Sequence, residues 1–475
     1  MKPAEYETYD GLGLAELLRD RQVSAEELMR CAVQLAEERA PAVNAICYPR
    51  YEDAILLARR AEPMGTFGAL PFLLKDSGLA SIFLPMSIGS RLFAGTISSA
   101  DATLTKRFLA DGFLPFARTT VPEFCMAPTT EAVQYGGPTR NPWELTRSPG
   151  GSSGGAAAAV ALGIVPIAHG SDGGGSIRIP ASCCGIFGLK PSRGLVPHGP
   201  LRGEGWGGLA SDGVLTRTVR DSAAALDGIA GMEQGAPYAA PPRPRSYLDL
   251  LDAPFERPLR IQHWISGWSN IPIASECRAA TERAAELLRD LGHDVVETLP
   301  PPLKYDSFID AIIEVMAANV AVTVNGHLRQ KPDTAFEQKL EPALLDAYHI
   351  GSALSAERYV LAINRFHATG RQLSAYMAGH DAILTPTLTQ PPVKLGTIST
   401  ATDFRSFRRQ AGRYTTFLAV FNAAGLPAAN LPLHRTAENL PIGVQLVGQF
   451  GEEVTILRLA AQLEAIAPWH NQQPF

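Results

Sequence analysis

The chain of 475 residues has no strong excess of charge of either sign, no long hydrophobic run and no cysteine pair with metal-ligand spacing. Lys and Arg total 42 against 47 Asp and Glu, so the net charge of −5 argues against the basic surface that nucleic-acid binding needs. No run of about 18 apolar residues is free of breakers and charges, so we expect no membrane-spanning helix. The N-terminus, MKPAEYETYDGLG, has no apolar core of the signal-peptide type.

The six cysteines are scattered without a Cys-x-x-Cys motif, and no histidine cluster has metal-ligand spacing. We therefore expect reduced, mostly buried thiols, no metal or other cofactor, and a cytoplasmic location. Apolar residues make up 46% of the chain, as in globular proteins, while 43 glycines and 37 prolines indicate many tight turns.

Apolar periodicity predicts alternating helices and strands, and therefore an α/β fold. Ser24 and Glu27 form a capping box that starts the second of two helices expected over 10–40. The other predicted helical segments are 54–61, 102–111, 275–292 and 305–375. Buried strands are predicted over 71–74, 113–117 and 259–262, and residues 380–450 are expected to alternate short strands with turns.

A proline-rich segment over 231–259 is the best candidate for a connector within the chain. The sequence contains no internal repeat. Because strands are expected on both sides of this segment, the two halves can build one continuous sheet, and we predict a single domain over residues 1–475.

Residues 171–178 read SDGGGSIR, with three glycines directly before Ser176. Successive glycines can turn several backbone N–H groups toward one point and form an anion-binding nest. Beside a nucleophile, such a nest serves as an oxyanion hole. For three glycines taken alone, a flexible turn is the alternative explanation.

Residues 150–155 read GGSSGG and match the pattern G-x-S-x-G twice, which suggests a nucleophile elbow. An elbow needs a preceding strand, however, and residues 144–149 are polar and end in a proline. The alanine-rich helix that follows could instead receive a phosphate at its N-terminus, but no Lys-Ser/Thr pair completes a P-loop.

Lys75 directly follows the apolar run Pro71-Phe72-Leu73-Leu74. A lysine at the end of an apolar strand is most often a surface residue whose ammonium group reaches water. If the side chain is buried, desolvation lowers its pKa and lets the neutral amine act as a general base.

Taken together, these segments resemble the amidase signature family, serine hydrolases that use a Ser–cis-Ser–Lys triad. The order matches: Lys75 closes a strand, and Ser152 and Ser176 stand 24 positions apart, as in the family. Blocks at 117–124 and 443–448 also resemble family motifs, and the similarity is weakest over about 235–380. Residues 168–194 are most similar to the branch with 6-aminohexanoate cyclic-dimer hydrolase and related amide and carbamate hydrolases.

The resemblance implies that Ser176 is the nucleophile, that Ser152 follows a cis peptide bond and bridges to Ser176, and that neutral Lys75 is the base. It implies an oxyanion hole formed by the backbone N–H groups of Gly173, Gly174, Gly175 and Ser176. It also implies supporting roles for Ser153, Asp172 and Arg178.

Two residues depart from the family pattern, since Ser171 and Gly173 stand where threonine and a β-branched residue are common. Serine still offers a hydroxyl and glycine keeps its N–H, so we expect an intact oxyanion hole on a looser loop. His169 lies seven residues before Ser176 and could suggest a Ser-His-Asp triad. A buried, hydrogen-bonded histidine is the simpler interpretation, and the lysine triad accounts for more residues.

The implied fold is a central mixed sheet covered by helices on both faces, with the core motif over 75–200 and a less regular substrate-covering segment over about 300–380. The implied reaction is cofactor-free hydrolysis of small, aryl or cyclic amides through a Ser176 acyl-enzyme. We expect Met126, Tyr135 and Trp206 to line the substrate pocket.

Three alternatives stay open from the sequence. The same triad could hydrolyse carbamates (urethanes) or esters. The chain could also be the A subunit of a tRNA-dependent amidotransferase, or a catalytically silent binding protein. By resemblance we expect a homodimer, a small-molecule amide or carbamate as the substrate, and neither nucleic acid nor a membrane as a partner.

Overall fold

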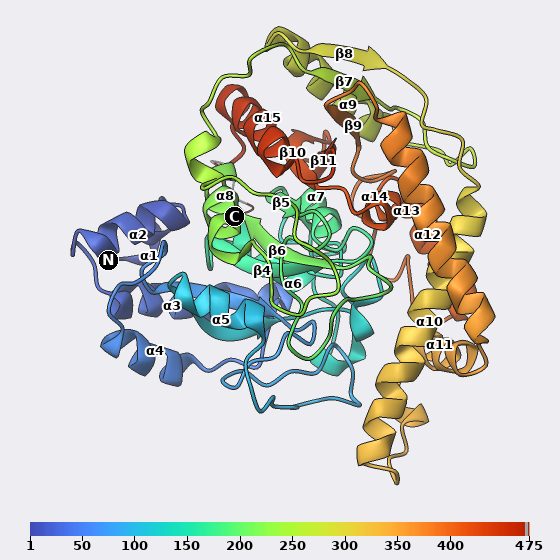
Figure 1. The fold of residues 1–475 in the computed structure, drawn as a ribbon. Helices are drawn as coiled ribbons and strands as arrows, with labels where there is room; N and C mark the ends of the chain where they lie inside the picture. Colours follow the sequence, from blue (N-terminus) through green and yellow to red (C-terminus); the bar gives the residue numbers. More distant parts are fainter. Residues whose placement is uncertain (471–473, 475) are drawn as a thin grey trace.

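The computed structural model describes residues 1–470 and 474, which form a mixed sheet with helices on both faces (Figure 1). Over these residues the sheet has eleven strands in the order β1-β3-β2-β4-β6-β5-β10-β11-β9-β7-β8. The strands are β1 (Ile46–Cys47), β2 (Leu70–Lys75), β3 (Phe113–Thr119), β4 (Ile167–Asp172), β5 (Phe187–Lys190), β6 (Ser211–Thr216), β7 (Arg260–His263), β8 (Asp294–Glu297), β9 (Ala382–Pro386), β10 (Ala428–Arg435) and β11 (Pro441–Gly448).

Strands from both sides of the proline-rich segment join this one sheet. β5 precedes the segment and β10 follows it, and the two pair antiparallel with Lys190 opposite Ala428. β2 pairs parallel with β3 and β4, and β7 pairs parallel with β8 and β9. The segment itself packs on the fold, since the Tyr247 N–H donates to the Asp227 carboxylate at 2.6 Å.

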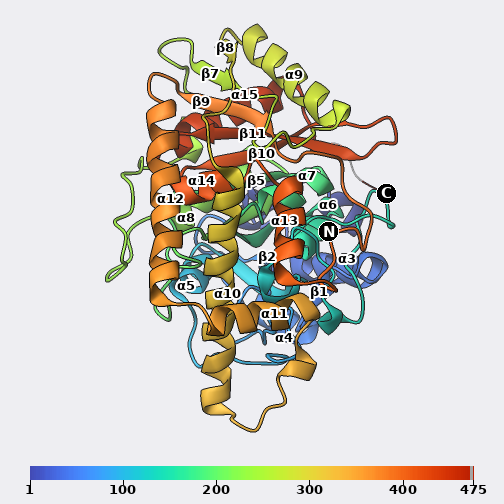
Figure 2. The same cartoon turned by 90° about the vertical axis from the view of Figure 1, so that its right-hand side faces the viewer.

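The helices surround the sheet and also form a separate cluster beside it. They are α1 (Pro3–Tyr6), α2 (Gly11–Arg19), α3 (Ala25–Val43), α4 (Tyr51–Arg60), α5 (Thr103–Ala110), α6 (Gly154–Ala161), α7 (Arg178–Cys184), α8 (Val219–Ile229), α9 (Ser275–Asp290), α10 (Tyr305–Gln330), α11 (Pro342–Ser352), α12 (Ala356–Tyr376), α13 (Phe404–Tyr414), α14 (Ala419–Ala424) and α15 (Glu453–Ile466). Figure 2 shows α10, α12 and α13 standing side by side in front of the sheet.

The alternation of side chains along β11 places helices on opposite faces of the sheet. A Cβ added to Gly443 would meet Ser182 of α7 at 2.8 Å, whereas a Cβ added to Gly448 would meet Ile456 of α15 at 2.9 Å. These two glycines lie an odd number of residues apart, so they face opposite sides. The expectation of a mixed sheet with helices on both faces is confirmed.

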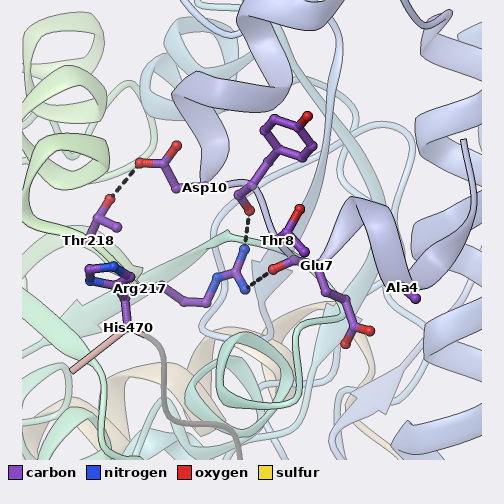
Figure 3. A pocket seen from close by; sticks show the side chains of 8 residues that line it. Ala4, Glu7, Thr8, Asp10, Arg217, Thr218 and His470 are labelled. Carbon is purple, nitrogen blue, oxygen red and sulfur yellow. Dashed lines mark hydrogen bonds between the residues drawn. The ribbon is translucent and has the colours of Figure 1, made fainter. Parts of the chain in front are cut away.

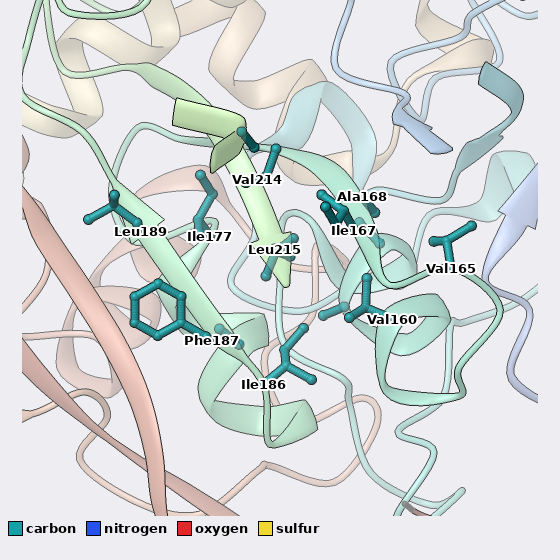
Figure 4. Close-up of a cluster of buried hydrophobic side chains, with 14 of the residues drawn as sticks. Val160, Val165, Ile167, Ala168, Ile177, Ile186, Phe187, Leu189, Val214 and Leu215 are labelled. Carbon is teal, nitrogen blue, oxygen red and sulfur yellow. The ribbon is translucent and has the colours of Figure 1, made fainter. Parts of the chain in front are cut away.

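The apolar core behind the glycine-rich segments consists of side chains from β4, β5, β6 and α6 (Figure 4). Val160, Ile167, Phe187 and Leu215 are all fully buried there. Each such side chain stabilises the fold by about 1.5–3 kcal/mol relative to an exposed one. This packing gives the loops at the strand ends a rigid support.

Local sequence signals located most of the elements. The capping box of Ser24 and Glu27 is present at the start of α3. Two expectations are wrong, however. Residues 380–450 contain the helices α13 and α14 besides their strands, because Phe404, Phe407 and Ala411 bury one helical face. The segment over about 300–380 is regular, since α10, α11 and α12 pack on one another around an apolar core.

Helix α10 is, within the described part of the chain, the one helix long and apolar enough to cross a membrane. Its apolar window is 61% buried within the fold, however. Phe308, Ile312 and Met316 lie on its inner face and are nearly inaccessible. The helix is therefore apolar because it packs against α11, α12 and α13.

Candidate active site

Lys75 lies at the end of β2 with its side chain fully buried. The apolar run before it places all six residues of the strand in the interior. Its Nζ lies 2.8 Å from Ser152 Oγ, 2.8 Å from Ser171 Oγ and 3.1 Å from the Ser171 carbonyl oxygen. Burial lowers the pKa of the Lys75 amine, which favours the neutral form that can accept a proton.

Ser152 lies in the loop that leads into α6, and the peptide bond between Gly151 and Ser152 is cis, as the resemblance implied. Glycine is required at position 151, because a Cβ there would lie 2.4 Å from the Thr129 carbonyl oxygen. Ser152 is 1% exposed and Ser176 is 8% exposed, and both line the same cavity. The two predicted catalytic serines and Lys75 are thus brought to one place.

Ser153 joins the two glycine-rich segments. Its N–H donates to the Ser176 carbonyl oxygen at 3.2 Å. Its hydroxyl lies 3.4 Å from both the N–H and the carbonyl oxygen of Ser171. The loop carrying Ser152 is therefore fixed against the end of β4.

Asp172 and Arg178 form a fully buried ion pair behind the glycine-rich loop, with Arg178 Nε 2.9 Å from Asp172 Oδ2. Burial by itself raises the pKa of the Asp172 carboxyl, but Arg178 and Asn422 outweigh burial and hold it below its usual range. Arg178 also donates to Gln445 Oε1 at 2.6 Å. Every partner of this network is polar and satisfied, so the pair is a firm support for the loop.

The backbone N–H groups of the loop divide into two sets. The N–H of Gly175 donates to Asp172 Oδ1 at 2.6 Å, so it is already engaged, contrary to the expectation that it faces an oxyanion. Within residues 1–470 and 474, the N–H groups of Gly173, Gly174 and Ser176 have no hydrogen-bond partner. These three donors are available to a negatively charged oxygen.

The two departures from the family pattern have structural explanations. The Ser171 hydroxyl contacts Lys75 Nζ, so the expected hydroxyl contact is present. At position 173, a Cβ would lie 2.5 Å from Cε3 of Trp206. Gly173 therefore leaves the space that the indole ring occupies.

His169 is fully buried and does not line the cavity that contains Ser176. Its Nδ1 accepts the Lys75 backbone N–H at 3.2 Å, and its Nε2 lies 3.1 Å from Asp212 Oδ1. Burial lowers its pKa, which favours the neutral ring. The geometry agrees with a hydrogen-bonded core histidine rather than with a base for Ser176.

The cavity over Ser176 has a volume of about 450 Å³. Its apolar lining residues include Met86, Ile88, Phe93, Phe124, Met126 and Val322. Its polar lining residues include His198, Arg202, Glu204, Asp212, Asn319 and Thr323. Trp206 also lines the cavity.

Of the three predicted pocket residues, the structure places Met126 and Trp206 at the cavity, but not Tyr135. The Tyr135 hydroxyl instead donates to Asp76 Oδ2 at 2.7 Å, and the N–H of Ser87 donates to the same carboxylate. Asp76 is buried and needs these donors. The prediction for Tyr135 is wrong because the buried Asp76 carboxylate requires hydrogen-bond donors, and the Tyr135 hydroxyl binds Asp76 instead of lining the cavity.

Comparisons with known proteins agree with this geometry. The sequence profile of the Amidase family matches residues 27–457. The chain belongs to the Amidase family. It is 33% identical over 482 residues to the 6-aminohexanoate-cyclic-dimer hydrolase of Paenarthrobacter ureafaciens, covering 98% of this chain and 96% of that protein. The likeness therefore extends over nearly all of this amidase.

Two solved structures are similar to this amidase over nearly its whole length. One is 6-aminohexanoate cyclic dimer hydrolase complexed with substrate, with a TM-score of 0.92, 31% identity and 98% of each chain covered. The other is a bacterial aryl acylamidase of the amidase signature family, with a TM-score of 0.87, 26% identity, and 98% of this chain and 97% of that one covered.

Several residues of the amidase site carried no signal in the sequence. Cys125 lines the cavity, and burial raises the pKa of its thiol. Asn422 and Gln445 reach Arg178 from positions about 250 residues away in the chain. Only the block at 443–448, which resembles a family motif, could have indicated Gln445.

A second concavity, of about 330 Å³, lies at the N-terminal end of the amidase (Figure 3). Arg217 there donates to the carbonyl oxygen of Glu7 at 2.7 Å and to that of Tyr9. Thr218 donates to Asp10. The guanidinium and the Thr218 hydroxyl thus both hold the N-terminal segment in place.

Proposed function

We propose that this amidase hydrolyses the C–N bond of small amides, including cyclic and aryl amides, through an acyl-enzyme on Ser176. The observation that carries the proposal is the placement of Lys75 Nζ 2.8 Å from Ser152 Oγ, in a buried site whose cavity Ser176 shares with Ser152. A neutral buried amine next to a hydroxyl provides the base that an unactivated serine needs.

Acylation begins when Ser176 Oγ attacks the carbonyl carbon of the amide. The Ser176 proton passes to Ser152 Oγ, and the Ser152 proton passes to Lys75 Nζ. The N–H groups of Gly173, Gly174 and Ser176 stabilise the oxyanion that forms. When the C–N bond breaks, the Lys75 ammonium returns its proton through Ser152 to the leaving nitrogen, which departs as a neutral amine.

Deacylation repeats the same proton path with water as the nucleophile. Water attacks the acyl carbon, and its proton passes through Ser152 to Lys75. Collapse of the second tetrahedral intermediate returns this proton to Ser176 Oγ and releases the carboxylic acid. No cofactor is needed in either half of the cycle.

The cavity walls and the relatives support small amides with an apolar part. Ile88, Phe93, Phe124 and Met126 offer an apolar surface in a cavity of about 450 Å³, within the usual range for small-molecule sites. Two similar proteins are named for a cyclic dimer and for aryl acylamides. Carbamates and esters pass through the same kind of tetrahedral intermediate, so they are included as further substrates.

We also propose that the amidase acts in the cytoplasm as a homodimer and needs neither nucleic acid nor a membrane. The net charge of −5 supports the absence of a nucleic-acid partner, and the burial of α10 supports the absence of a membrane anchor. Sedimentation equilibrium of the purified chain tests the dimer.

The test of the proposed function is turnover of a mixed panel by the purified wild type and by Ser176→Ala, read by product mass. The panel contains aryl amides, primary alkyl amides, a cyclic amide, aryl carbamates, an ester and glutamine. We expect the wild type to hydrolyse amides and Ser176→Ala to hydrolyse none. Hydrolysis of glutamine alone would instead favour the amidotransferase subunit.

A further inference from the structure

The cavity over Ser176 is adjacent to a second, much smaller pocket of about 20 Å³. The two cavities share four lining residues, which are Cys125, Met126, Ser176 and Trp206. We call the smaller cavity the inner pocket. Its other lining residues include Gly174, Ile179, Met316, Arg408, Ala411 and Thr415. Ser176 therefore lies at the boundary between a large chamber and a very small one.

We infer that Trp206 determines which acyl groups this amidase accepts, because its indole closes the inner pocket against the acyl part of the substrate. The inference rests on the proposed function. Ser152, which returns the proton to the leaving amine, lines the main cavity and not the inner pocket. The leaving amine therefore lies in the main cavity.

The acyl group lies on the other side of the reacting carbon. The free N–H of Gly174 belongs to the glycine-rich loop over residues 173–176, here called the oxyanion loop. Gly174 also lines the inner pocket. An acyl chain on Ser176 that extends away from Ser152 is thus directed along the oxyanion loop toward the inner pocket. Trp206 is the largest side chain in the boundary that it meets.

The indole is held in place by contacts with the oxyanion loop. A Cβ on Gly173 would lie 2.5 Å from the ring, so the ring rests directly on the glycine backbone. Trp206 adopts a positive φ of 54°, and Gly207 and Gly208 follow with φ of 65° and 79°. Three successive left-handed residues are an unusual turn, which needs support from its surroundings.

Asn422 supplies that support. Its side-chain Nδ2 donates to the Leu209 carbonyl oxygen at 3.1 Å and to the Asp172 carbonyl oxygen at 3.0 Å. Arg193 donates to the Gly208 carbonyl oxygen at 2.6 Å. The Trp206 turn and the oxyanion loop are therefore fixed to each other, and the ring is a rigid wall.

The inner pocket becomes accessible when the ring is removed. It has room for about one water-sized group as it stands, too little for an alkyl chain. Truncation of Trp206 would join it to the main cavity and add space next to Ile179 and Met316. An added methylene bound in an apolar pocket raises kcat/KM by about tenfold or more.

The test measures kcat/KM for 4-nitroanilides of acetic, butanoic, hexanoic and octanoic acid, which share one leaving group. We expect Trp206→Ala to raise the octanoyl-to-acetyl ratio of kcat/KM by at least about tenfold over wild type. Phe93→Ala is the matched control, because Phe93 lines the main cavity and not the inner pocket. We expect it to leave this ratio unchanged.

Trp206→Leu keeps part of the apolar contact and provides a second variant if circular dichroism shows that Trp206→Ala does not fold. We expect Trp206→Leu to raise the octanoyl-to-acetyl ratio by a smaller factor.

Gly173→Ala tests the contact between the indole ring and the glycine backbone. We expect it to lower kcat/KM on all four substrates, and we expect Trp206→Ala in the same chain to restore part of the loss.

An unchanged ratio in both Trp206 variants, or an equal rise in Phe93→Ala, would overturn the inference alone. If wild type and Ser176→Ala hydrolyse every substrate of the panel equally, the proposed function fails and the inference with it. The two failures are therefore distinguished by the Ser176 variant.

Discussion

The backbone N–H of Lys75 donates to Nδ1 of His169 at 3.2 Å, so this histidine holds the strand that carries the lysine. Since Nδ1 accepts, the proton of the neutral ring lies on Nε2, which is 3.1 Å from Asp212. From the sequence, Lys75 and His169 were both candidates for the base that activates Ser176, and the structure gives the two side chains different roles. In the proposed mechanism Lys75 moves a proton, and His169 positions Lys75.

This separation predicts different losses for the two side chains. We expect Lys75→Met to lower kcat by about 10²–10⁴-fold, the usual contribution of a general base. His169→Leu removes an acceptor for the Lys75 N–H and a donor to Asp212, but no group that moves a proton in the proposed mechanism. It should lower kcat by less than about tenfold at equal folded fraction. Steady-state kinetics on one amide measures both values. A larger loss in His169→Leu than in Lys75→Met would reverse the two roles.

The pH dependence of kcat follows from the buried amine. Burial lowers the pKa of Lys75, and only the neutral amine accepts the proton from Ser152. Activity is therefore complete above this lowered pKa and is lost as the pH falls through it. We expect kcat to fall at acidic pH in the wild type, and we expect His169→Leu to retain this acidic limb of the pH–rate profile. Loss of that limb in His169→Leu would assign it to the imidazole instead.

The buried pair of Asp172 and Arg178 predicts a large stability effect. Arg178→Met leaves the Asp172 carboxylate buried without a counter-charge, and we expect a loss of about 3–5 kcal/mol in the free energy of unfolding. Arg409→Met is the control, since its pair with Asp310 is exposed and such pairs contribute about 0–1 kcal/mol. Urea denaturation measures both, and similar losses would contradict the account.

Glu123 predicts a pH-dependent stability. Burial, with a smaller effect from Glu341, raises the pKa of its carboxyl from 4.5 to about 8. The folded state therefore holds a proton that the unfolded state releases. The stability this group contributes is fully present below pH 4.5 and is lost as the pH rises through about 8.

Glu123→Gln removes this titration. The difference in unfolding free energy between wild type and Glu123→Gln should fall across that range, by at most about 1.4 kcal/mol per pH unit. Urea unfolding at intervals between pH 4 and pH 9 measures the difference. Curves that stay parallel for the two proteins would show that Glu123 titrates normally.

Local patterns predicted those parts of the fold and site that local forces decide. The apolar run before Lys75 predicted a buried strand, and the capping box predicted the start of α3. The order of motifs, through a family resemblance, indicated that Lys75, Ser152 and Ser176 meet. Nothing in their spacing alone fixes a distance of 2.8 Å.

The incorrect predictions concern residues whose positions are determined by tertiary contacts. Tyr135 binds Asp76, and Gly175 binds Asp172, and neither partner could be read from sequence spacing alone. Asn422 reaches the oxyanion loop from α14, a helix within the segment 380–450 that was expected to alternate short strands with turns. For α13 a signal was present, since Phe404, Phe407, Ala411 and Tyr414 follow helical spacing, but its many arginines obscured it.

The most direct test of the central claim is intact-protein mass spectrometry of the amidase, quenched with acid during turnover of a slowly deacylated aryl amide. We expect an adduct with the mass of the acyl group, mapped by peptide digestion to Ser176 and absent from Ser176→Ala. An acyl adduct on another residue, or turnover that persists in Ser176→Ala, would contradict the assignment of Ser176 as the nucleophile.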